Sequence, residues 1–408
     1  AERMGIRRIS PQWCYYRPFW KQLEDDGLKV AVFDVPYSFP GTLEKGLEIM
    51  DWGTHGQTWP LACNDSEVAG WLGKSVIGRE TPVQKSSRQL NRIRDSLVKG
   101  AARRAEVICR ILNERNPDVL VAVFGETHRG GHTLFARPGR GSGNEPLLDV
   151  YQAVDAALGR ILEAAADKPA QVLIFSVHGM TRDHAQGHLV RPLMQAINRH
   201  FMHQQYASAP SRKPGLVGWL RRRVPARLQH AVGAAASDGV RQWVVEREMI
   251  GGIDWSQSPG FALRTDIRTE IRLNLKGREK NGLLEPGSDG LSRYVALLKS
   301  VFLELETADT RERLVEDVVD THQLFPGPRQ NRLPDLVITW RPLPAASEVI
   351  SPTIGSLHAR AKEVRGGDHT DHGFAIYRGT EPVATECLAH TQDFAAVIRR
   401  LAKTAGTD

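Results

Sequence analysis

Short apolar runs and amphipathic stretches alternate along this sequence. The apolar runs are rich in β-branched residues and end near proline or glycine, as buried strands do; they are Leu28–Ser38, Asp118–Phe124, Ala170–Val177, Leu333–Trp340 and Gly373–Gly379. Apolar residues at helical spacing fill three other stretches, Ser87–Asn113, Asn144–Ala166 and Asp183–His200. This alternation predicts an α/β fold, with a mostly parallel central sheet that holds the first four runs and is flanked by helices.

The composition of the sequence changes near His200. Lys213–Gly233 is basic and is punctuated by glycine and proline, with apolar residues among its arginines. Such a segment fits a cationic element that lies on a membrane or a partner, or a helical cap with solvated arginines. We favour the cap. The expected organisation is an α/β core in two parts, residues 13–199 and 261–400, interrupted by an insertion or cap at residues 200–260.

Composition narrows the class of protein only modestly. The chain has 408 residues, 41% hydrophobic and 25% charged, which are ordinary values for a globular protein. Its formal charge of +7 suits a small anionic substrate as well as a polyanion. Its four cysteines are scattered and form no CxxC pair. This spacing argues against a disulfide framework or a thiolate zinc site and favours a reducing compartment.

Targeting signals are not evident in the sequence. No apolar run approaches the eighteen or so residues of a membrane span, so we expect no transmembrane helix. The first ten residues, AERMGIRRIS, lack the apolar core of a signal peptide. We therefore expect a cytoplasmic protein. Because the chain starts with alanine, it can also be a processed or partial product.

Three polar clusters follow or border the apolar runs: GETHRGGH, SVHGM and RGGDHTDHG. In parallel sheets, ligands gather beyond the carboxyl ends of the strands. Neutral imidazole is a common ligand for zinc, and three such ligands leave one position open for water or substrate. His128 and His132, four residues apart, are therefore candidate ligands. The alternative is a polar loop whose histidines bond only to their neighbours.

The clusters also carry a resemblance to a known family. SVHGM resembles the "S-D-H-G-M" segment of the alkaline phosphatase superfamily, in its type I phosphodiesterase/nucleotide pyrophosphatase branch. FWKQLEDDGLKVAVFDVPYSFP, LNLKGREKNGLLEPG and LPDLVITW resemble further segments of that branch, and RGGDHTDHG its "G-x-H-x-x-x-G" close. GETHRGGH lies where the branch carries Asp and His four residues apart. The matches keep the family order from about Trp13 to Arg400.

The resemblance implies a two-metal hydrolase, but this chain departs from the pattern. Family enzymes attack phosphorus with a threonine or serine, upstream of the segment that matches Phe19 and Trp20. Only eighteen residues precede Phe19, and Ser10 is the only serine or threonine among them. We therefore expect that the chain either is a fragment or has lost the nucleophile.

Two of the implied metal ligands have also changed. Val177 replaces the aspartate of "S-D-H" and cannot bind a cation, whereas His128 replaces another aspartate and can. The expected ligands are His128, His132 and His369, with His178 as a further candidate. The expected cofactor is a divalent metal, zinc in the first place, as one ion rather than two.

Several other residues border these clusters. Glu126 either orients an imidazole by accepting its second N–H or caps the following turn. A substrate or supporting role is open for three more residues, Arg365, Asp371 and His372. For Arg278 we favour a salt bridge inside the fold. His184 and His188 have metal-like spacing, but the family has no ligands there, and we favour a surface helix.

Two functions from different classes remain. The first is a metal-dependent hydrolase of phosphate diesters, nucleotide pyrophosphates or related phosphate or sulfate esters, whose partner is a small anionic ester. The second is a degenerate member of the same superfamily that binds or scaffolds without catalysis. Nucleic-acid binding through Arg221–Arg223 depends on a single basic run and is disfavoured.

Overall fold

The computed structural model describes residues 17–39, 41–54, 60–75, 77, 85–135, 146–167, 169–205, 253–265, 268–360 and 365–404. These residues divide between two compact units. The first, which we call the histidine unit, contains the described residues of Arg8–Asp183 and Glu363–Asp408. The second, the antiparallel unit, contains those of His184–Lys362. Basic segment Lys213–Gly233 lies outside the described residues, so its role as a cap stays a prediction.

The histidine unit contains a four-stranded sheet in the order β3-β2-β1-β4. Its strands are β1 (Val30–Phe33), β2 (Leu47–Met50), β3 (Ala62–Cys63) and β4 (Val119–Ala122). Strand β1 runs parallel to both β2 and β4, while β3 is antiparallel to β2. The helices of the unit are α1 (Phe19–Asp25), α2 (Ser66–Leu72), α3 (Ser87–Arg115), α4 (Glu126–Leu134), α5 (Pro146–Ala164) and α12 (Phe394–Thr404).

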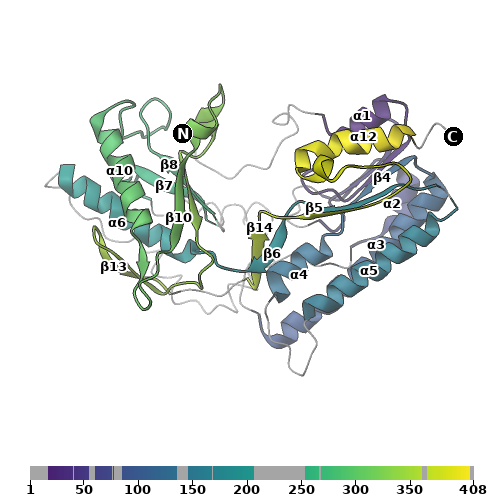
Figure 1. The fold of residues 1–408 in the computed structure, drawn as a ribbon, viewed down its shortest axis with the longest axis horizontal. Coiled ribbons are helices and arrows are strands. Elements are labelled where there is room, and N and C mark those ends of the chain that lie inside the picture. Colours follow the sequence, from purple (N-terminus) through teal and green to yellow (C-terminus); the bar gives the residue numbers. More distant parts are fainter. Residues whose placement is uncertain are drawn as a thin grey trace. The chain divides into compact units, whose positions relative to one another are not determined.

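Helices cover both faces of this sheet (Figure 1). Successive side chains of a strand point to opposite faces, so Ala31 and Phe33 pack with residues of α3, while Val30 and Val32 pack with α1 and α12. Helix α3 begins at a capping box in which Ser86 and Gln89 satisfy each other's backbone N–H groups. The result is a three-layer α/β arrangement in which the carboxyl ends of the parallel strands β1, β2 and β4 lie at the same edge of the sheet.

Two short antiparallel ladders complete the histidine unit. Strand β5 (Val172–Ser176) pairs with β15 (Phe374–Arg378), and β6 (Gly179–Arg182) pairs with β14 (Gly367–Thr370). Two 3-10 turns, η4 (Thr385–Leu388) and η5 (Thr391–Asp393), lead from β15 into α12. Phe175 packs edge-on against Phe394 with ring centroids 4.6 Å apart, which fixes α12 against β5.

The antiparallel unit is built on a sheet in the order β10-β11-β8-β7. Its strands are β7 (Gly260–Thr265), β8 (Arg268–Leu273), β10 (Val315–Asp320) and β11 (Leu336–Trp340), and a smaller sheet holds β9 (Glu306–Thr307), β12 (Glu348–Ser351) and β13 (Gly355–His358). Its helical segments are α6 (Gly187–Gln205), η2 (Trp255–Gln257), α10 (Asp289–Leu303), α11 (Thr321–Leu324) and η3 (Gln330–Arg332). Residues of α6 and α10 share one apolar core with β8 and β11.

The predicted strands and long helices form where the pattern places them, and the fold mixes helices with sheets as expected of an α/β protein. The prediction that four of the strands share one largely parallel sheet is wrong for the described residues. Strands β1 and β4 are parallel neighbours, but β5 pairs only with β15, and β11 lies between antiparallel partners. In β11 only alternate residues are fully buried, as suits a strand with one face on a core.

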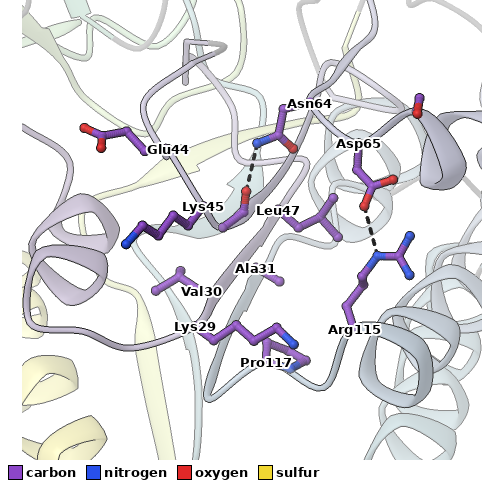
Figure 2. A pocket seen from close by; sticks show the side chains of 12 residues that line it. Lys29, Val30, Ala31, Glu44, Lys45, Leu47, Asn64, Asp65, Arg115 and Pro117 are labelled. Carbon is purple, nitrogen blue, oxygen red and sulfur yellow. Dashed lines mark hydrogen bonds and ion pairs between the residues drawn. The ribbon is translucent and has the colours of Figure 1, made fainter.

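A pocket of about 340 Å³ lies at the amino ends of β1 and β2 (Figure 2). Lys29 and Lys45 line it, and Arg115 at its rim donates to Asp65 over 2.9 Å. The carboxyl ends of these strands, where α/β proteins bind their ligands, lie on the other side of the sheet. This pocket therefore lies away from the edge of the sheet where a functional site is expected.

Glu24 ties the loop before β2 to helix α1. Its carboxylate accepts hydrogen bonds from the backbone N–H groups of Glu44, Lys45 and Gly46, at 2.7–3.2 Å, and from Lys21 Nζ at 2.8 Å. Burial alone would raise the pKa of Glu24, but the hydrogen bonds from Lys21 and the three N–H groups lower it to about 2. The folded state therefore favours the ionised form of Glu24.

We expect Glu24→Gln to lower the free energy of unfolding by about 1–3 kcal/mol at pH 7, because the three N–H groups and Lys21 lose a charged acceptor. Since the folded pKa of Glu24 is depressed from 4.5 to about 2, its stabilisation is present above pH 4.5 and is lost as the pH falls towards 2. Urea unfolding between pH 7 and pH 2.5 should show a weaker acid dependence in the variant. Glu44→Gln, at a side chain that is 78% exposed, is the control.

Within the part of the chain that the structure describes, no helix is both long and apolar enough to cross a membrane.

Candidate metal centre

The segment GETHRGGH forms helix α4 rather than the loop that its glycines suggest. Helix α4 starts directly beyond the carboxyl end of β4, at the edge of the sheet where ligands are expected. His128 and His132 are four residues apart and so lie on the same face of this helix. Their ring centroids are 4.7 Å apart, at an interplanar angle of 88°.

Two glycines of α4 allow the helix to approach its neighbours closely. A Cβ atom at Gly131 would lie 2.5 Å from Met180 Cε of β6. One at Gly130 would lie 2.9 Å from Leu147 Cδ1 of α5. A larger residue at either position would require the side chain of Met180 or Leu147 to move. The glycines therefore bring the α4 histidines to the strands that carry the other two.

His178 and His369 come from the pair of antiparallel ladders. His178 lies between β5 and β6, and His369 lies in β14 opposite Met180. At the junction of the ladders a Cβ atom at Gly373 would overlap the carbonyl oxygen of Ser176, so only glycine fits there. The rings of His178 and His369 face each other with centroids 4.1 Å apart.

The structure thus brings together the four histidines that the sequence singles out. The ring centroid of His128 lies 5.0 Å from that of His369 and 5.2 Å from that of His178. The ring centroids of His132 and His369 are 4.7 Å apart. The donor atoms of His128, His178 and His369 all lie within 4.8 Å of one another. Nitrogen ligands of a tetrahedral zinc ion are about 3.3–3.5 Å apart, from Zn–N bonds of about 2.0–2.1 Å. Small side-chain rotations would close that difference.

Backbone carbonyls orient two of these rings. Nδ1 of the buried His132 lies 3.0 Å from the carbonyl oxygen of Gly367, and Nδ1 of His178 lies 3.1 Å from that of Gly179. Because a carbonyl only accepts, each Nδ1 carries the proton and each Nε2 keeps its lone pair. A metal-binding histidine characteristically has such a partner on its second nitrogen. The tautomers therefore suit metal binding before any ion arrives.

Asp368 belongs to the cluster, although the sequence did not single it out. It is completely buried, and its donor atom lies within 4.8 Å of those of His132 and His369. Its Oδ1 accepts the backbone N–H of His369 over 2.8 Å, and its Oδ2 lies 3.5 Å from Arg365 Nη1. The signal that could have found it is its place beside His369 in a strand with glycines on its amino side.

The remaining candidates of this unit lie around the cluster. Asp371 and His372 are exposed in the turn after β14. Val177 is 55% exposed, next to His178. Glu126 accepts from Arg104 through Oε1, and its buried Oε2 has no hydrogen-bond partner in the part of the chain that the structure describes, so Glu126 contacts no imidazole there. Arg365 lies beside the cluster, with its Nη1 3.5 Å from Asp368 Oδ2.

The candidates in the antiparallel unit have structural contacts. Arg278 forms a bidentate pair with Asp335, with both N···O distances 2.7 Å, which confirms the predicted internal salt bridge. Burial alone would lower the pKa of Arg278, but Asp335 and Glu279 raise it. Helix α6 starts at Gly187, and His188 at its start donates through Nε2 to the carbonyl oxygen of Ala346.

The residues present fit a divalent transition metal. Imidazole nitrogen suits zinc, copper, iron and nickel, whereas calcium and magnesium prefer oxygen donors. Four imidazoles and one buried carboxylate converge here, and two of the rings are fixed in the ligating tautomer. The described residues could therefore hold a metal ion.

Comparison with known proteins agrees with the motifs. No match was found among curated proteins. The model of one family, described as type I phosphodiesterase / nucleotide pyrophosphatase, matches residues 2–348. That segment contains α4 and His178 and ends before β14 with His369. Since the match covers most of the chain, this protein belongs to the type I phosphodiesterase/nucleotide pyrophosphatase family.

Proposed function

We propose that this protein is a metal-dependent hydrolase of phosphate diesters, nucleotide pyrophosphates or related phosphate or sulfate esters. Membership of the family supports hydrolysis of such bonds. The observation that carries metal dependence is the convergence of His128, His132, His178 and His369 from α4, β14 and the β5–β6 junction. These elements are far apart in sequence, and a purely structural role would not require four imidazoles at one place.

In this proposal a single zinc ion is held by His128, His178 and His369, with His132 and Asp368 beside it. A bound zinc ion would polarise a phosphoryl or sulfuryl oxygen of the ester and so stabilise the charge that develops on it. The backbone carbonyls of Gly367 and Gly179 keep the imidazoles in the ligating tautomer. Arg365 lies beside Asp368, and its guanidinium also suits the anionic group of a substrate.

A second function is favoured by one observation. Val177 presents an exposed isopropyl group beside His178, at the position where the resembling family segment has an aspartate. A site with one ion instead of two could bind an anionic ester without turning it over. The second candidate is therefore a metal-dependent binding protein for the same class of ligand.

Turnover of bis(p-nitrophenyl) phosphate and p-nitrophenyl sulfate by the zinc-loaded chain separates these functions. We expect diester hydrolysis to fall by more than about 100-fold in His132→Ala/His369→Ala, because a metal ion supplies several kcal/mol of charge stabilisation. A chelator should have the same effect on the parent. His200→Ala, at a partly buried histidine of α6 in the antiparallel unit, is the control. Equal rates in parent and double variant would refute the hydrolase, and zinc-dependent binding of phenyl phosphate without turnover would establish the binding protein.

A further inference from the structure

A charged cluster is buried on the side of α4 that faces α3. Arg104 of α3 donates through Nε to Glu126 Oε1 over 3.0 Å and through Nη1 to Asp34 Oδ2 over 2.8 Å. The side chains of Arg104 and Glu126 are 0% exposed, and that of Asp34 is 1% exposed. Burial alone would lower the pKa of Arg104, but the charges of Glu126 and Asp34 raise it, so the guanidinium stays ionised.

Asp34 fastens this cluster to the sheet. It follows β1 with a left-handed backbone, at φ 59°. Its carboxylate also accepts from the N–H groups of Trp52 and Gly53, at 2.8 and 3.0 Å, and from Thr54 Oγ1 at 2.6 Å. Arg104 is thus bound to the carboxyl ends of β1 and β2 independently of α4. Arg104 Nε is left to bond to Glu126 of α4.

Within the described part of the chain, the Glu126 carboxylate has one hydrogen bond, from Arg104. Oε1 accepts from Arg104 Nε, and the buried Oε2 has no hydrogen-bond partner among the described residues. The carboxylate also lies close against α3, since a Cβ atom at Gly100 would be 3.3 Å from Oε1. Burying a carboxylate with a single hydrogen bond costs free energy. The position of Glu126 in α4 suggests which functional role offsets that cost.

Glu126 is the first residue of α4. At about 100° per residue, its side chain points roughly 200° around the helix from that of His128 and about 240° from that of His132. The carboxylate therefore fastens one face of α4 to α3, while the histidines project from the other face. Any tilt of the amino end of α4 would move both rings relative to His178 and His369.

We propose that Glu126 is a positioning residue for the metal centre: through its bond to Arg104 it sets the start of α4 and thereby the places of His128 and His132. This inference rests on the proposed metal-dependent function. The part of it that says Glu126 fixes the start of α4 can be tested without a metal. The hydrogen bond from Arg104 is the operative feature. The proposal therefore predicts that a neutral side chain of the same shape and accepting capacity will serve.

Glu126→Gln and Glu126→Ala test this in the full chain. Zinc affinity is measured by competition with a chromophoric chelator, and the site geometry by the visible spectrum of the cobalt(II) form. Hydrogen exchange of the α4 amides is measured without metal. We expect Glu126→Ala to weaken zinc binding by about 10–100-fold, as loss of a supporting partner does, and to alter the cobalt spectrum. Exchange over residues 127–134 should be faster, while Glu126→Gln should stay within about threefold of the parent in affinity.

Glu106→Ala, which removes an exposed carboxylate that pairs with Arg103 on the same helix α3, is the matched control and should change neither readout. If Glu126→Ala does not fold, Glu126→Asp replaces it, because its carboxylate is one methylene too short to reach Arg104. Parent-like affinity and exchange in Glu126→Ala would overturn the proposal, as would a Glu126→Gln variant as weak as Glu126→Ala. A parent that binds no zinc would defeat the proposed function, and exchange in the metal-free α4 would still decide whether Glu126 positions the helix.

Discussion

Replacing His132 and His369 together by alanine should remove tightly bound zinc from this protein. Each ring centroid lies within 5.0 Å of that of His128, and Nδ1 of His132 is held by a backbone carbonyl. Structural zinc sites in zinc-finger peptides bind with roughly 10–16 kcal/mol shared among their ligands, so losing the ligand His369 together with the adjacent His132 should weaken binding on the order of 100-fold or more. Metal analysis after dialysis should find about one equivalent in the parent and far less in the variant.

His188→Ala is the control for that measurement, because His188 bonds to the carbonyl oxygen of Ala346 and lies in the antiparallel unit. Its metal content should equal that of the parent. Two tightly bound equivalents in the parent would contradict the single-ion proposal, which depends on Val177. Equal metal content in the parent and the double variant would show that the clustered histidines are structural.

Local patterns in the sequence were sufficient to predict most of the strands and helices. The helical spacing of Ser87–Asn113 reappears as α3 (Ser87–Arg115), and the apolar run Ala170–Val177 as β5. Sheet partners depend on contacts between distant segments, which an apolar run does not encode. The run Leu333–Trp340 therefore suggested a parallel strand, although β11 pairs antiparallel with β8 and β10.

The candidate site could be predicted from the sequence because its histidines lie beside glycines at strand ends. The helical conformation of GETHRGGH could not be predicted, because each of its two adjacent glycines disfavours an isolated helix by about 1 kcal/mol. In the fold, packing offsets that cost: Gly130 and Gly131 lie where α4 comes close to Leu147 and Met180. A local penalty that serves a tertiary contact cannot be recognised from local propensity.

Arg104 was the residue that the sequence could have revealed and did not. It lies on the apolar face of α3, at helical spacing from the buried residues Leu97, Ala101 and Ile108. An arginine on such a face must find buried carboxylates or remain unpaired at high cost. Asp34 and Glu126, both directly beyond apolar strands, were its partners.

Arg104→Met should therefore be among the most destabilising single substitutions in the histidine unit. It would leave Asp34 and Glu126 as buried carboxylates without their cation, and breaking a buried pair by removing one partner costs about 3–5 kcal/mol. The cation–π contacts of Arg104, whose Cζ lies 5.2 Å from the ring centroids of Phe33 and Trp52, would be lost as well. Urea unfolding followed by circular dichroism measures the loss.

Arg94→Met on the same helix is a matched control, because Arg94 also contacts two carboxylates, those of Asp95 and Asp149, but is 31% exposed. Surface pairs contribute about 0–1 kcal/mol, so this variant should unfold within about 1 kcal/mol of the parent. Adding Glu126→Gln to Arg104→Met should restore part of the lost stability, since one of the two unpaired charges disappears. Similar small losses in Arg104→Met and Arg94→Met would contradict the buried cluster, and with it the anchoring of α4 to α3.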